Sequence, residues 1–167
     1  NKEITALAPM IVGGGQESNL RGGTENIYGI VGLAKAFELA NEHMAEHQAQ
    51  IRGIKKYMCQ QLKANFPEVR FNGQCESEDS LYTVLSVCLP PSERGDMVLL
   101  SLDIQGVAAS GGSACSSGAT SASHVLEAIS ANLQRPNVRF SFGRFTTKEE
   151  IDYAVETLKN VYALATV

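Results

Sequence analysis

The sequence has no tryptophan, no long apolar run and no large basic cluster. No apolar stretch approaches the roughly 18 residues that cross a bilayer, so we expect no membrane span. Asn1-Lys2-Glu3 leads into a mixed segment, whereas a secretory signal has a basic start followed by an apolar region. The longest basic run is the pair Lys55-Lys56 and the net charge is −4, which argues against nucleic-acid binding.

Closely paired metal-binding or redox motifs are also missing. None of the cysteines forms a CxxC motif or stands beside a histidine. His43 and His47 are four residues apart, but their neighbours are polar and charged, so we expect no metal site. With 167 residues, 44% of them hydrophobic, the chain can form a core without disulfides. The sequence therefore predicts four free thiols in a reducing cytoplasm: Cys59, Cys75, Cys88 and Cys115.

Hydrophobic periodicity predicts an α/β organisation. Apolar residues recur at three- and four-residue steps from about Glu25 to Asn65, which indicates one long helix or two abutting helices ending before Pro67. Gln16 to Thr24 is a predicted loop. Short elements then alternate, with strands expected at 4–12, 69–71, 82–89, 107–109 and 138–142 and helices expected after Ser92, through 124–129 and after Thr147. Thr147 and Glu150 have the spacing of a capping box.

The run Ser110 to Gly118 (SGGSACSSG) surrounds Cys115 with small residues. Such neighbours cannot pack the thiol into a core, and they allow a loop that brings it to a substrate. We interpret Cys115 as a candidate nucleophile. A surface loop with an incidental cysteine is the alternative reading of the same pattern.

Two further motifs suggest anion binding. Gly13 to Gly15 and Arg21 to Thr24 could form a phosphate cradle from backbone N–H groups, the Thr24 hydroxyl and the start of the following helix. Arg139 alternates with apolar residues in a buried-looking strand, so a carboxylate or phosphate partner is expected. Glycine turns without a ligand and a structural ion pair are the respective alternatives.

These three motifs, in this order, resemble the cysteine desulfurases of the NifS/IscS group within class V of the aminotransferase superfamily. The matching segments are Gly13 to Ala36 (GGGQESNLRGGTENIYGIVGLAKA), Ser110 to Leu126 (SGGSACSSG followed by SHVL) and Val138 to Asp152 (VRFSFGRFTTKEEID). The resemblance extends over essentially the whole chain.

The resemblance implies a pyridoxal 5′-phosphate (PLP) enzyme of the aspartate aminotransferase-like fold, fold type I. In that family a loop cysteine attacks the sulfur of PLP-bound L-cysteine, which leaves alanine and an enzyme persulfide. Cys115 falls on the nucleophile and Arg139 on the residue that binds the substrate carboxylate. Thr24 falls on a residue that reaches the PLP phosphate of the neighbouring subunit, which implies a homodimer. The implied sulfur acceptor is a protein such as an iron–sulfur scaffold.

The resemblance also implies that the chain is a C-terminal portion. Residues 1–25 would be the edge of the PLP-binding domain, 26–65 the linking helix and 66–167 the small α/β domain. The Schiff-base lysine segment of the family has no counterpart here, so we expect this portion to be inactive alone. The family loop also has serine where Gly22 stands, with little expected consequence. Two alternatives remain, a stand-alone persulfide carrier without PLP and another class V enzyme.

Overall fold

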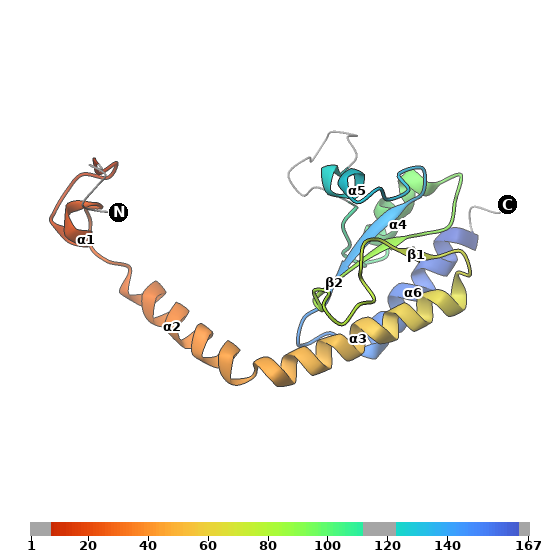
Figure 1. The fold of residues 1–167 in the computed structure, drawn as a ribbon, viewed down its shortest axis with the longest axis horizontal. Helices are drawn as coiled ribbons and strands as arrows, with labels where there is room; N and C mark the ends of the chain where they lie inside the picture. Colours follow the sequence, from red (N-terminus) through yellow and green to blue (C-terminus); the bar gives the residue numbers. More distant parts are fainter. Residues whose placement is uncertain (1–7, 112–122, 164–167) are drawn as a thin grey trace. The chain divides into compact units, whose positions relative to one another are not determined.

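The computed structural model describes residues 8–111 and 123–163, which belong to two compact units. The first unit is Asn1–Met44 and the second is Ala45–Val167. Figure 1 traces the elements of each along the chain. The second unit contains the described sheet and most of the buried apolar side chains.

A three-stranded antiparallel sheet forms the centre of the second unit. Strand β2 lies in the middle, with β1 on one edge and β3 on the other, and β2 pairs with β3 over the full length of both strands. The bounds are β1 (Arg70–Phe71), β2 (Val84–Cys88) and β3 (Asn137–Ser141).

Helices cover both sides of this sheet. Helices α3 and α6 lie on one side and α5 lies on the other (Figure 1). Helix α4 contacts α6, and the Tyr153 hydroxyl donates a 2.8 Å hydrogen bond to the Gln105 carbonyl at the end of α4. The bounds are α3 (Met44–Asn65), the 3₁₀ turn η1 (Gly95–Met97), α4 (Val98–Ile104), α5 (His124–Ala128) and α6 (Lys148–Ala163).

Alternation along β2 and β3 gives the sheet one apolar and one polar face. Side chains of successive strand residues point to opposite faces, and directly paired residues share a face. The apolar face packs against α3 and α6 and carries Leu85, Val87, Val138 and Phe140, all buried in the core cluster. The opposite face carries Ser86, Asn137 and Arg139. The sheet therefore separates the core from a polar surface.

Several predicted elements are confirmed, and the capping box is one of them. The Thr147 Oγ1 atom accepts a 3.3 Å hydrogen bond from the Glu150 N–H, and the Glu150 carboxylate accepts one of 3.0 Å from the Thr147 N–H. Helix α6 begins at the next residue, Lys148. The reciprocal bonds satisfy N–H groups that have no partner inside the helix.

Other predicted elements differ from the structure. Residues 107–109 form no strand; Ser110 alone makes a bridge to Arg139. Of the strand expected at 4–12, the described residues 8–12 are irregular. The predicted loop from Gln16 contains the one-turn helix α1 (Gln16–Asn19), in which Glu17 and Ser18 have left-handed backbone angles. A short apolar run forms a strand only where a second strand offers hydrogen bonds. Because that second strand is usually distant in sequence, the local pattern alone does not predict the pairing.

Helix α2 (Ile27–Glu42) dominates the first unit. Its cap is Asn26, whose side chain accepts a 3.0 Å hydrogen bond from the Gly29 N–H. None of its residues is buried, and its large apolar side chains are exposed, with Tyr28 at 93% and Phe37 at 75%. A helix this apolar is normally covered by other protein segments. Among the described residues no helix is long and apolar enough to cross a membrane.

Arg135 is a buried cation whose hydrogen bonds connect three segments of the second unit, those before β1, after β2 and before β3. Its side chain is 9% exposed. Nε donates a 2.7 Å hydrogen bond to the Leu89 carbonyl after β2, and a terminal nitrogen donates one of 2.6 Å to the Glu68 carbonyl before β1. The guanidinium thus satisfies two carbonyls that lie where strands begin and end.

Removing this guanidinium should destabilise the fold. We expect Arg135→Ala to lower the free energy of unfolding by about 2–4 kcal/mol, because it leaves two carbonyls without their charged donor. Urea unfolding followed by circular dichroism measures the loss. Arg135→Lys supplies one ammonium group in place of the planar guanidinium. It should therefore recover only part of the lost stability. A variant as stable as the wild type would contradict this role for Arg135.

Candidate functional site

The three predicted site residues fall in different parts of the chain. Arg139 lies on β3 in the second unit, and Thr24 lies in the loop before α2 in the first. Cys115 lies outside the described residues, between Gly111 and Ser123. The geometry of the site therefore rests on Arg139 and its surroundings.

Arg139 is exposed, although the sequence suggested that its strand is buried. Its apolar neighbours Val138 and Phe140 point into the core, so strand alternation places Arg139 on the polar face. Within the described ranges its guanidinium has no carboxylate partner, and its one side-chain hydrogen bond, 3.2 Å, goes to Ser110 Oγ. The charge is available for an external anion.

A cavity of about 290 Å³ lies beside Arg139, between the polar face of the sheet and α5. Ser86 and Asn137 contribute from the strands, Val125 contributes from α5, and Ile129 contributes from the residue that caps the end of α5. Among its described lining residues, Arg139 is the one permanently charged side chain. A mostly apolar cavity with one guanidinium suits a small molecule that carries a carboxylate. We call it the arginine cavity.

A hydrogen-bonded row of amides and hydroxyls fixes the polar face beside Arg139. The buried Asn72 donates from Nδ2 to Ser86 Oγ at 3.0 Å and to Asn137 Oδ1 at 2.8 Å. Asn137 in turn donates to the carbonyls of Asn132 and Arg135 at 2.9 Å. Since these donors and acceptors satisfy one another, the floor of the arginine cavity is rigid. Sequence analysis missed Asn72, whose partners lie in distant strands.

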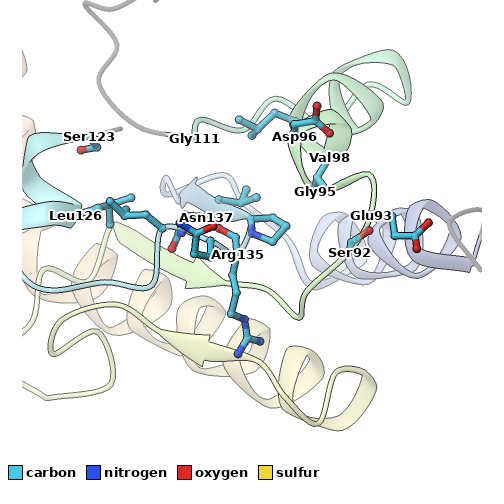
Figure 2. Close-up of a pocket in the computed structure, with 15 residues that line it drawn as sticks. Ser92, Glu93, Gly95, Asp96, Val98, Gly111, Ser123, Leu126, Arg135 and Asn137 are labelled. Atoms are coloured by element: carbon cyan, nitrogen blue, oxygen red, sulfur yellow. The ribbon is translucent and has the colours of Figure 1, made fainter. Parts of the chain in front are cut away.

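A second, larger cavity of about 490 Å³ adjoins the first (Figure 2). Gly111 and Ser123 line both cavities. Glu93, before η1, and Asp96, in η1, line this cavity together with Arg135, whose guanidinium is already bonded to the Leu89 and Glu68 carbonyls. The two carboxylates would repel a carboxylate ligand, and the engaged guanidinium offsets them only in part. The arginine cavity is therefore the better candidate for an anionic substrate, although it is smaller.

Two N–H groups of the predicted phosphate cradle already have partners inside the loop. The Gly22 N–H donates a 2.8 Å hydrogen bond to the Ile11 carbonyl, and the Gly23 N–H donates to Gln16 Oε1 at 3.3 Å. Both groups are thus engaged within the loop itself. Thr24 is exposed, so its hydroxyl remains a candidate for a phosphate contact.

Gly22 has a structural role that the sequence did not indicate. A Cβ atom at this position would lie 2.6 Å from the Gly13 nitrogen and 2.8 Å from the Val12 carbonyl carbon. Those contacts are with backbone atoms, which cannot turn away. The serine of the family pattern would therefore displace the backbone at Val12 and Gly13.

The described cysteines are poor competitors for a nucleophilic role. Burial raises the pKa of Cys59 to about 11, and burial also raises the pKa of Cys88. Both thiols thus hold their protons more firmly than an ordinary cysteine, and thiolate is the reactive form. Cys75 is half-buried, with its sulfur 2.8 Å from the Asn72 carbonyl oxygen. None of the three lines the arginine cavity.

The described residues fit part of a PLP site. Arg139 offers a carboxylate contact and Thr24 a hydroxyl, but no lysine is among the described residues lining the arginine cavity. The buried Lys55 donates to Ser80 Oγ and the Leu81 carbonyl at 2.9 Å, and Lys63 is paired with Glu76. The described residues thus offer groups that could contact an anionic ligand, and none of the residues that line the arginine cavity could anchor PLP covalently.

Comparison with known proteins gives a consistent assignment. Residues 10–154 match the family model described as aminotransferase class-V. The chain is 36% identical over 159 residues to cysteine desulfurase IscS of Dictyoglomus turgidum, covering 94% of this chain and 40% of the relative. It is 38% identical over 162 residues to cysteine desulfurase IscS of Clostridium botulinum, covering 96% and 41%.

Comparison with solved structures supports the same assignment. A NifS-like protein superposes with a TM-score of 0.76 at 28% identity, over 98% of this chain and 41% of that one. The apo structure of a cysteine desulfurase from Thermococcus onnurineus shares the fold with a TM-score of 0.66 at 20% identity, over 93% and 39%. The chain thus spans about 40% of the length of the relatives it matches.

Proposed function

Because the chain belongs to the class-V aminotransferase family, we propose that it is part of a PLP-dependent cysteine desulfurase. The main support is Arg139, an exposed arginine without a carboxylate partner in the described structure, at the edge of a small, mostly apolar cavity. In this proposal residues 1–25 are the edge of the cofactor domain, 26–65 link the domains and 66–167 form the small domain. The enzyme works in the cytoplasm.

In the proposed reaction Arg139 binds the α-carboxylate of L-cysteine, and its planar guanidinium can hold both carboxylate oxygens. The Cys115 thiolate attacks the substrate sulfur. An S–S bond forms while the Cβ–S bond breaks, and the electron pair of that bond stays on the carbon fragment, which takes up a proton to give alanine. PLP, when bound, supplies the electron sink for this cleavage.

The persulfide on Cys115 then passes its outer sulfur to an acceptor protein, such as an iron–sulfur scaffold or a protein of thio-cofactor synthesis. Thr24 contacts the PLP phosphate of a neighbouring subunit, so the enzyme acts as a homodimer. Residues 1–167 alone turn over no cysteine, since none of the lysines that the structure describes lines the arginine cavity.

The proposal is tested with the full-length protein. PLP-loaded enzyme incubated with L-cysteine should release equal amounts of alanine and sulfide when a reducing thiol is present. Without the reducing thiol, mass spectrometry should find one extra sulfur on the peptide that contains Cys115. Protein that binds PLP but releases no sulfide would overturn the proposal.

Two alternative functions predict different results. A stand-alone persulfide carrier would gain the extra sulfur on Cys115 from a persulfide donor without PLP. Another class V enzyme would bind an amino acid through Arg139 and turn it over without Cys115. The match to relatives named cysteine desulfurase over most of this chain favours the first proposal.

A further inference from the structure

Ser110 is the residue that holds Arg139 on the edge of the sheet. Strand β3 pairs with β2 on one side, and on its other side Ser110 forms an isolated antiparallel bridge with Arg139. The bridge has both backbone hydrogen bonds, from the Ser110 N–H to the Arg139 carbonyl at 3.1 Å and from the Arg139 N–H to the Ser110 carbonyl at 2.5 Å. The backbone N–H and carbonyl of Arg139 are thus both engaged by Ser110.

The bridge also places the two side chains together. Directly opposed residues of an antiparallel pair project from the same face, so the Ser110 hydroxyl lies on the polar face with Arg139. Ser110 Oγ accepts a 3.2 Å hydrogen bond from a terminal nitrogen of the guanidinium. This is the one side-chain hydrogen bond of Arg139 in the described structure. The neighbouring Ser86 hydroxyl accepts a hydrogen bond from Asn72 instead.

We propose that Ser110 is a positioning residue, which orients the Arg139 guanidinium for the substrate carboxylate. An arginine side chain has several rotatable bonds, and fixing them costs free energy each time a ligand binds. A hydroxyl that already holds one terminal nitrogen reduces that cost and leaves the other N–H groups of the planar fork for the carboxylate. The inference rests on the proposed function, because it assigns the carboxylate to an amino-acid substrate.

The test compares Ser110→Thr with Ser110→Val in the full-length, PLP-loaded enzyme. Threonine and valine have nearly the same shape and both favour strands, and threonine alone keeps the hydroxyl. We expect Ser110→Val to raise KM for L-cysteine by about five- to tenfold with kcat within about twofold, the size of one ordinary hydrogen bond. Ser110→Thr should stay within about twofold of the wild type in both constants.

Two controls separate positioning from general structural damage. Ser101→Ala removes another half-buried serine hydroxyl, on α4, and should leave both constants unchanged. In an Arg139→Ala background, Ser110→Val should add no further increase in KM, because a residue that acts through Arg139 has no effect once Arg139 is gone. Additive effects of the two substitutions would overturn the inference.

A binding measurement provides a readout that does not depend on turnover. Calorimetric titration with L-alanine, the amino-acid product, should give a Kd about five- to tenfold higher for Ser110→Val than for Ser110→Thr. Equal Kd values in protein that releases sulfide would overturn the role of Ser110 and leave the proposed function standing. Wild-type protein that neither binds L-alanine nor turns over L-cysteine would overturn both.

Discussion

Replacing Cys115 by alanine is expected to reduce sulfide release from L-cysteine by at least about a thousandfold, because the variant lacks the nucleophile of the proposed reaction. No described cysteine can substitute. Cys59 and Cys88 are buried with raised pKa values, and Cys75 lines a different cavity. Alanine and sulfide are measured under single-turnover conditions with the full-length enzyme.

Cys75→Ala is the matched control for Cys115→Ala. It removes a half-buried thiol that does not line the arginine cavity and should keep sulfide release within about twofold of the wild type. Binding of L-alanine should survive in both variants, because Arg139 is intact in each. Full turnover by Cys115→Ala would favour a class V enzyme with different chemistry.

The second large effect concerns Arg139. We expect Arg139→Ala to raise KM for L-cysteine by about a hundredfold, since the substrate carboxylate loses its charged partner inside a mostly apolar cavity. Arg139→Lys keeps the charge without the two-pronged geometry and should give an intermediate KM. Steady-state kinetics of the full-length enzyme measure both values.

Arg135 and Arg139 form a matched pair, because they lie four residues apart with opposite roles. Arg139 is exposed and has no ion pair in the part of the chain that the structure describes, so Arg139→Ala should change the free energy of unfolding by less than about 0.5 kcal/mol. Arg135→Ala should destabilise the fold and leave the KM of the remaining folded enzyme unchanged. A loss of stability in Arg139→Ala with normal KM would show that the two roles were assigned the wrong way round.

Local signals in the sequence predicted much of the second unit. The helical periodicity, the Thr147 capping box and the β-rich segment before Pro90 all depend on residues near one another in the chain, and the corresponding elements are present. The open choice between one helix and two is resolved as two, with a break at His43 between α2 and α3.

Contacts between distant residues could not be predicted in this way. Arg135 stands in the polar stretch before β3, and its partners Leu89 and Glu68 are 46 and 67 residues away. Ser110 was expected to follow a strand, whereas its single bridge depends on Arg139, 29 residues on. The exposure of Arg139 was predictable in principle, because strict alternation in β3 assigns it to the face opposite Val138 and Phe140.

The two faces of β3 have a consequence for how this domain can change over evolutionary time. Substitutions at Val138 or Phe140 alter the core, where a change of even one methylene group is felt. A substitution at Arg139 alters the lining of the arginine cavity and leaves the core untouched. The exposed face of this strand can therefore change toward a new ligand while Val138 and Phe140 keep the domain folded, so new specificity need not be acquired at the expense of the scaffold.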